Sequence, residues 1–169
     1  MIACVDVHYR DTRAVAAGIA FRGWLDESVV AEQVITVSDI QPYNPGKFFV
    51  RELPCLLAVL EKLPAMEIVL IDGYVRLEKD RPGLGAHLYT SLESRIPVIG
   101  VAKTRYVGAE NAQEIVRGKS KQPLYISAAG LSVREAAEHV RSMHGPYRIP
   151  TLLKRVDRLS RSKSKIPSF

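Results

Sequence analysis

Apolar residues dominate three segments at the start of the chain, and short polar turns separate them. Residues 1–9 are typical of a buried strand, and residues 13–25 and 28–37 follow with the same character. Asp11-Thr12 and Asp26-Glu27 are the expected turns. Three strands on such short connections predict an antiparallel meander.

The spacing of apolar residues then changes from that of a strand to that of a helix. Leucines and a phenylalanine recur at helical intervals from Phe49 to Leu63, although Pro54 requires either a first-turn position or a kink. Later segments alternate between the two patterns. They are a strand over 67–72, a helix over 83–94, strands over 97–103 and 124–127, a helix that begins at the capping box Ser132-Val-Arg-Glu135, and a last helix over 151–162.

This order of elements predicts an α/β protein with one mixed sheet. An antiparallel three-stranded meander is followed by parallel strands, and helices cover both faces. That is the architecture of the ribonuclease H-like fold. A fold alone does not decide the chemistry, so the functional argument depends on individual side chains.

Length and composition are those of an ordinary globular protein. The chain has 169 residues, 47% of them hydrophobic and 25% charged, which predicts a single domain over residues 1–160 with a C-terminal tail over 161–169. No apolar run is long enough to span a membrane, and no signal peptide is expected at the start. The two cysteines, Cys4 and Cys55, lie in core-like segments, which favours free thiols and a reducing, cytoplasmic location.

Positive charge is concentrated at the C-terminus. Residues 151–169 hold six basic residues and one acidic residue, a net charge of +5 out of +6 for the whole chain. A basic tail on a nearly neutral body predicts a polyanionic partner, most commonly nucleic acid. A solvated C-terminus without a partner would explain the same charge run.

Two aspartates lie in segments that are otherwise apolar strands. Asp6 stands between Val5 and Val7, and Asp72 ends the run Ile-Val-Leu-Ile-Asp. In a ribonuclease H-like sheet these two strands are neighbours, so the carboxylates should lie side by side and repel each other. A bound Mg²⁺ would relieve that repulsion through hard oxygen ligands. Acidic clusters of this kind hold the metals of many nucleases.

Two further acids have both a functional and an ordinary interpretation. Glu52, near the start of the first helix, would suit a metal site or the positive end of the helix dipole. Asp157, in the last helix, would suit the same site or a simple ion pair with Lys154 or Arg161.

Five blocks of sequence, in the same order, resemble the endonuclease V family, metal-dependent nucleases of inosine-containing nucleic acid. They are Cys4-Val-Asp6-Val; Pro42-Tyr-Asn-Pro-Gly46 with Val50-Arg-Glu-Leu-Pro54; Ile71-Asp-Gly73 with Gly83-Leu-Gly-Ala-His-Leu88; Ile99-Gly-Val-Ala-Lys103; and Pro123-Leu-Tyr-Ile-Ser127, Tyr147-Arg-Ile-Pro150 and Asp157-Arg-Leu-Ser160. The blocks span nearly the whole chain.

The resemblance implies roles for particular residues. Asp6, Glu52 and Asp72 correspond to the metal ligands, for Mg²⁺ with Mn²⁺ as a substitute, and Lys103 and Asp157 complete the catalytic set. Tyr43 corresponds to a wedge that holds the strands apart beside the lesion. The residues expected to contact nucleic acid are Pro42, Tyr43, Pro45, Gly46, Gly73, Gly83, Arg158 and Arg161.

The loop after Asp72 departs from the family pattern. Val75 replaces a second glycine, and Glu78-Lys79-Asp80 replaces His-Pro-Arg. A β-branched side chain and an added anion near the metal predict weak discrimination in favour of inosine.

These observations favour a monomeric, Mg²⁺-dependent endonuclease that hydrolyses the phosphodiester bond 3′ to inosine in DNA or RNA, as in repair. Two alternatives stay open. One is a nucleic-acid-binding relative with weak catalysis, and the other is a ribonuclease H-like nuclease that acts on a different structure, such as branched or unpaired strands.

Overall fold

The meander at the N-terminus forms one half of the sheet. The computed structural model describes residues 1–10, 12–38, 40, 42, 45–109 and 111–162. β1 (Ile2–Arg10) pairs antiparallel with β2 (Arg13–Phe21), which pairs antiparallel with the edge strand β3 (Ala31–Val37). The predicted meander is confirmed. Its second strand ends at Phe21 because the Asp26 carboxylate accepts hydrogen bonds from the N–H groups of Arg22 and Gly23, which form a turn.

The other half of the sheet begins with parallel strands. β4 (Ile68–Asp72) pairs parallel with β1, and β7 (Val98–Ala102) pairs parallel with β4. β9 (Leu124–Ala129) then pairs antiparallel with both β7 and the short strand β8 (Gln113–Ile115). The full order is β3-β2-β1-β4-β7-β9-β8. A parallel neighbour of β7 would need a crossover connection, usually a helix. No helix lies between β7 and β9 in the described chain, which agrees with their antiparallel pairing.

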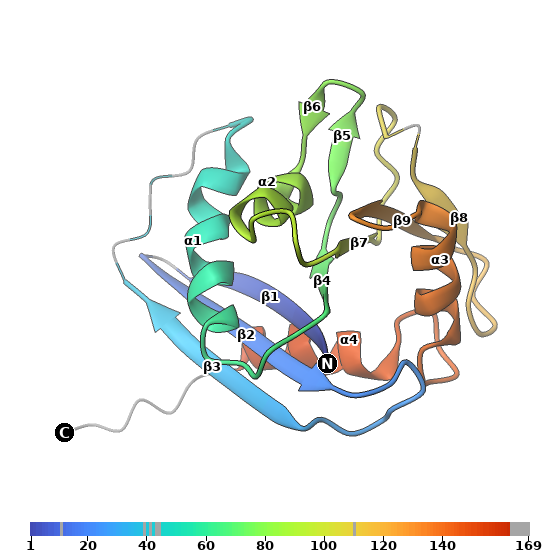
Figure 1. The fold of residues 1–169 in the computed structure, drawn as a ribbon, viewed down its shortest axis with the longest axis horizontal. Coiled ribbons are helices and arrows are strands. Elements are labelled where there is room, and N and C mark those ends of the chain that lie inside the picture. Colours follow the sequence, from blue (N-terminus) through green and yellow to red (C-terminus); the bar gives the residue numbers. More distant parts are fainter. Residues whose placement is uncertain (11, 39, 41, 43–44, 110, 163–169) are drawn as a thin grey trace.

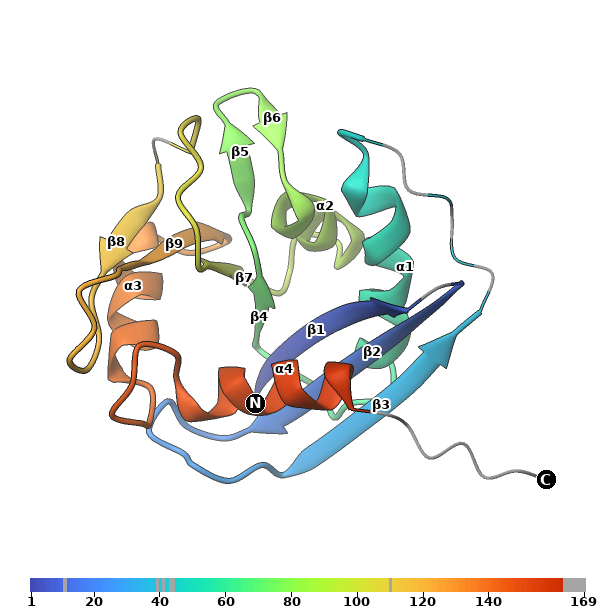
Figure 2. The same cartoon turned by 180° about the vertical axis from the view of Figure 1, so that it is seen from behind.

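Helices cover both faces of the sheet (Figures 1 and 2). α1 (Phe48–Leu60) and α2 (Leu84–Ser91) share one apolar core with the sheet, and α3 (Val133–Ser142) and α4 (Thr151–Arg161) share the other. Figure 2 shows α4 in front of β1 and β2, in agreement with its contacts with both strands. The predicted mixed sheet with helices on both faces is confirmed. No helix in the described ranges is long and apolar enough to cross a membrane.

A small hairpin projects from the end of β4 that carries Asp72. It consists of β5 (Arg76–Glu78) and β6 (Arg81–Pro82), and it stands away from the main sheet in both views (Figures 1 and 2). α1 continues through Pro54 instead of starting at it. The predicted N-cap of α3 forms, with the N–H of Glu135 donating to the Ser132 hydroxyl at 3.1 Å.

Candidate active site

Asp6 lies at the centre of the site, midway along β1. Val5 pairs with Ile71 across the parallel strands, so Asp6 and Asp72 occupy the next positions on neighbouring strands. The Ser160 hydroxyl donates to Asp6 Oδ2 at 2.5 Å. Burial, helped by the charges of Asp72 and Asp157, raises the pKa of Asp6 to about 6, although the hydrogen bond from Ser160 opposes this shift. A carboxylate kept partly out of water in this way favours a cationic ligand.

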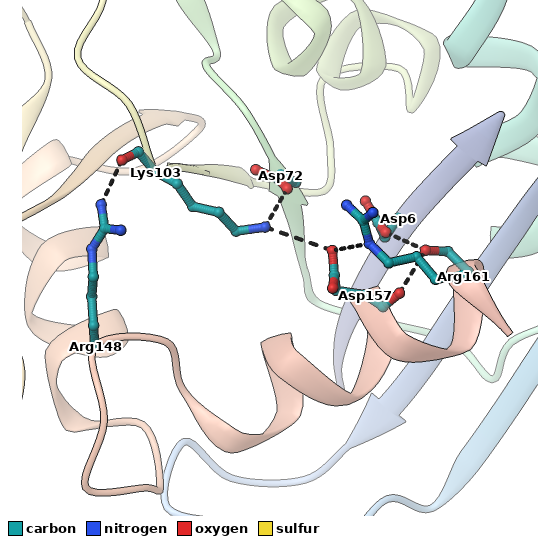
Figure 3. Close-up of polar contacts among 7 residues, drawn as sticks. Asp6, Asp72, Lys103, Arg148, Asp157 and Arg161 are labelled. Atoms are coloured by element: carbon teal, nitrogen blue, oxygen red, sulfur yellow. Dashed lines mark hydrogen bonds and ion pairs between the residues drawn. The ribbon is translucent and has the colours of Figure 1, made fainter.

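Lys103 connects the ends of two strands with the last helix. It follows β7, and its ammonium donates to Asp72 Oδ2 at 2.7 Å and lies 3.7 Å from Asp157 Oδ1 (Figure 3). Burial lowers the pKa of Lys103, but the hydrogen bond and charge of Asp72, with Asp157 and Asp6, outweigh burial and raise the pKa overall. The side chain is therefore a positively charged donor at neutral pH, and a poor base.

Glu52 approaches the two aspartates from α1. Its side chain is 6% exposed, and its Oε2 has no hydrogen-bond partner among the residues that the structure describes. Burial, followed by the charges of Asp6 and Asp72, raises the pKa of Glu52 to about 8. An orphaned oxygen of this kind is costly unless a proton or a cation satisfies it.

Asp157 comes from α4, on the opposite face of the sheet from α1. Its Oδ1 accepts from Arg161 Nε at 3.1 Å as well as facing Lys103 (Figure 3). The sequence left open whether Asp157 would belong to the site or pair locally with Lys154 or Arg161; the structure shows the pair with Arg161 and also places Asp157 beside Lys103. Together with Asp6, Asp72 and Lys103, it lines a narrow hollow of about 20 Å³ whose apolar wall includes Ile149.

The carboxylate oxygens of Asp6, Glu52 and Asp72 are the type of ligand that a divalent cation prefers, although the three side chains do not converge on one point. Within the described ranges, no three His, Cys, Asp or Glu side chains are arranged to hold a metal ion. Lys103 instead neutralises Asp72. The orphaned Glu52 oxygen and the mutual repulsion of three carboxylates nevertheless match the needs of a hard cation such as Mg²⁺. The residues present therefore fit such an ion.

The residues expected to contact nucleic acid are spread over several places. Pro42, Pro45 and Gly46 are exposed ahead of α1, while Tyr43 lies outside the described residues. Gly73 follows Asp72 with φ +122°, which suits glycine.

The other three expected contacts, Gly83, Arg158 and Arg161, come from α2 and α4. Gly83 caps α2, and an added Cβ there would meet the Tyr74 carbonyl oxygen at 2.6 Å, so close packing also requires glycine at this position. Arg161 is engaged with Asp157 in the site. Arg158 is exposed on a different side of α4 and lines a separate groove.

The altered loop is arranged differently from the expectation. Val75 is 1% exposed, packs into the core beside Gly85, and donates its N–H to the Ser127 hydroxyl at 2.9 Å. Glu78 accepts from the Tyr106 hydroxyl at 3.1 Å and lies 3.8 Å from Arg81, on the projecting hairpin. It is absent from the charges that perturb Asp6 and Glu52. The expected anion beside the metal ligands is therefore paired elsewhere.

Two residues that contact the site, Ser160 and Arg148, received no functional role from the sequence. Ser160 binds Asp6, and its signal is the i, i+3 spacing from Asp157, which puts both on one face of α4. Arg148 donates to the carbonyl of Lys103 at 2.5 Å (Figure 3) and to that of Pro123 at 2.8 Å. No local pattern indicates that contact, because it joins distant segments.

A ribonuclease H-like sheet with acidic residues and a lysine at the carboxyl ends of its central strands defines a class, the nucleases of that fold. The family model for endonuclease V matches residues 1–158. The chain belongs to the endonuclease V family.

Individual relatives agree with this assignment. An endonuclease V of Streptomyces coelicolor is 32% identical in an alignment that covers 94% of this chain and 76% of the relative. The crystal structure of endonuclease V from Streptomyces avermitilis is 28% identical and superposes with a TM-score of 0.76, covering 95% of this chain and 79% of that one. Endonuclease V of Ciona intestinalis, solved with DNA containing an inosine followed by a ribo-adenosine, shares the fold at 22% identity and a TM-score of 0.74, covering 95% and 84%.

Proposed function

We propose that this chain is a divalent-metal-dependent endonuclease that hydrolyses the phosphodiester bond 3′ to inosine in DNA or RNA, and so serves repair of deaminated adenine. The observation that carries the proposal is that the buried Glu52 lies close enough to Asp6 and Asp72 for their charges to raise its pKa, beside Lys103, in a member of the endonuclease V family. The inosine-containing DNA bound by the Ciona relative supports the choice of substrate.

Asp6, Asp72 and Glu52 would hold the cation, Mg²⁺ or Mn²⁺ in its place. When bound, such an ion supplies Lewis-acid stabilisation of phosphate oxygens and lowers the pKa of a coordinated water. The free carboxylate oxygen of Glu52 would gain the partner that it lacks among the described residues.

Lys103 would act on the phosphate. Its retained positive charge suits it to donate a hydrogen bond to a scissile phosphate oxygen or to the leaving oxygen, where negative charge develops. Asp157 restrains the ammonium from the side of α4. Ser160 holds Asp6 in one orientation through its hydroxyl.

We expect only modest preference for inosine. A flipped base is read through close hydrogen bonds in a fitted pocket. The N–H of Val75, where the family pattern has a glycine, is already donated to Ser127 and so has no donor left for a base. The pairing of Glu78 with Tyr106 and Arg81 supports retained catalysis, because that anion does not crowd the acids.

The test is cleavage of matched oligonucleotides that carry inosine or adenosine at one position, single- and double-stranded, with Mg²⁺, with Mn²⁺ or with a chelator. We expect metal-dependent nicking that favours inosine, and no nicking by Asp72→Asn. In calorimetric titration, Asp6→Asn and Asp72→Asn should lose the cation site, whereas the exposed control Glu61→Gln should keep it.

Other results of the same cleavage experiment would favour the two alternative functions. Nicking of inosine and adenosine substrates at equal rates would indicate a nuclease that recognises another structure. Binding without nicking under every condition would indicate a relative that retains only nucleic-acid binding. We further expect a monomer in a reducing, cytoplasmic setting, with which the free, buried thiols of Cys4 and Cys55 are compatible.

A further inference from the structure

An exposed aromatic ring stands at the end of a groove along the outer side of α4. Tyr147 is 68% exposed, an unusual state for a large aromatic side chain. The groove has a volume of about 660 Å³, and Lys154 and Arg158 lie along its helical wall. The two cations are four residues apart, so they follow one side of the helix.

The backbone on either side of Tyr147 is fixed by the guanidinium groups of Arg117, which is buried, and Arg148. Arg117 is 6% exposed, donates to the carbonyl of Tyr147 at 2.8 Å and to that of Gly145 at 3.2 Å, and also bonds the carbonyl of Met143. The following residue, Arg148, is fixed to Lys103 and Pro123. The exposed ring is therefore held on a rigid support, so little conformational entropy would be lost when a ligand stacks on it.

The groove carries positive charge that is available to a ligand. Lys154 Nζ lies 5.6 Å from the centre of the Tyr147 ring, and neither Lys154 nor Arg158 forms an ion pair with any described residue. Arg155, by contrast, is neutralised by Glu32 at 2.7 Å. The acid that lines the groove, Glu27, faces His144 at 3.5 Å.

The groove adjoins the candidate active site. Ile149 lines both the groove and the hollow that contains Asp6, Asp72 and Lys103. A polymer bound at Asp72 and Lys103 could therefore continue past Ile149 onto Tyr147 without leaving the surface.

We propose that Tyr147, Lys154 and Arg158 form a binding track for a single-stranded segment of nucleic acid next to the scissile bond. One unpaired base stacks on Tyr147, and the phosphates that follow lie beside the two cations. A single strand fits better than a duplex because only unstacked bases offer a free face to the ring. This inference names the form of nucleic acid that the site takes, and so rests on the proposed function.

The test measures binding without cleavage. Fluorescence anisotropy with a chelator present would compare a labelled oligo-dT strand with a duplex of equal length. Tyr147→Ala should weaken single-strand binding about fivefold or more, as expected for loss of one stacked base. Tyr147→Phe, the matched control, should bind as the wild type does because it keeps the ring. The double variant Lys154→Gln, Arg158→Gln should lower the slope of log K against log salt by about 1.4, while Lys62→Gln at the end of α1 should leave it unchanged.

Several results would overturn the track. One is unchanged single-strand affinity in Tyr147→Ala, and another is an equal loss in Tyr147→Phe. A loss of the same size on the duplex would remove the assignment to single strands. Because the assay contains neither inosine nor metal, failure of the proposed cleavage activity would leave this result intact, and the reverse also holds.

Discussion

At the scale of single residues, protons and a metal ion compete for the buried carboxylates of the folded protein. The pKa of Glu52 is raised from about 4.5 to about 8, chiefly by burial. The folded state therefore binds a proton that the unfolded chain releases, and stability falls as pH rises through that window. Asp6, raised from 3.8 to about 6, acts in the same direction at lower pH.

Replacing Glu52 with glutamine should remove most of this dependence in metal-free protein. We expect the difference in Tm between Glu52→Gln and the wild type to be small at about pH 5 and to reach several degrees in favour of the variant at about pH 9. Thermal unfolding in a chelator followed by circular dichroism would measure it. A constant difference across that range would show that Glu52 is ionised in the folded protein throughout. Addition of Mg²⁺ should raise the Tm of the wild type more than that of the variant.

Arg148 should act through Lys103. Loss of its hydrogen bond to the Lys103 carbonyl frees the backbone that aims the ammonium, so Arg148→Met should lower kcat by about one to two orders of magnitude with little change in KM. Single-turnover cleavage would measure the rate, and acylation of Lys103 followed by mass spectrometry should be faster in the variant. In a Lys103→Ala background the same substitution should cost much less. Fully additive losses would place the effect of Arg148 elsewhere.

At the scale of elements, the sequence predicted those with a clear period or cap. The meander, the parallel strands and the Ser132 N-cap of α3 all formed. β8 and the β5–β6 hairpin were missed because strands of two or three residues are too short to show alternation. The direction of β9 was missed because it depends on its connection to β7 and not on its own residues.

The part of the candidate site that depends on strand order was predictable from the sequence. Asp6 and Asp72 were expected on neighbouring strands, and the register bears this out. The contact of Ser160 with Asp6 joins residues 154 positions apart, and that of Arg148 with Lys103 joins residues 45 positions apart. Both depend on how α4 and the segment before it pack against the sheet, which no local pattern reveals. The orientation of Val75 depends in turn on the gap left by Gly85, which no local pattern reveals.

The segment that joins β4 to the hairpin should tolerate little change at Val75. Because its side chain fills core space, Val75→Ala should lower the free energy of unfolding by roughly 1–3 kcal/mol. Val107→Ala, the same change at a side chain that is 90% exposed, should have almost no effect. Urea titration of both variants would make the comparison. Equal stability would mean that residue 75 faces solvent and is free to shape a base pocket.

At the scale of the whole molecule, the basic C-terminus should add affinity without selecting a sequence. Arg161 is already engaged with Asp157, so termination after Ser162 removes only Lys163 and Lys165 as further cations. The slope of log K against log salt for duplex DNA should then fall by up to about 1.8, that is, two cations at about 0.9 each. Affinity measured across a salt series would test this, and the ratio of affinities for two unrelated sequences should stay constant. An unchanged slope would mean that the tail does not contact the duplex.

The hydrogen bond from Ser160 to Asp6 also has a consequence for biosynthesis. It joins residues 154 positions apart, so one wall of the catalytic centre comes from the start of the chain and another from near its end. The N-terminal part of a protein leaves the ribosome first. A growing chain that already contains β1 and β4 therefore still lacks Asp157 and Ser160. On the proposed mechanism the nascent chain therefore becomes competent only once α4 has been synthesised and has packed against β1.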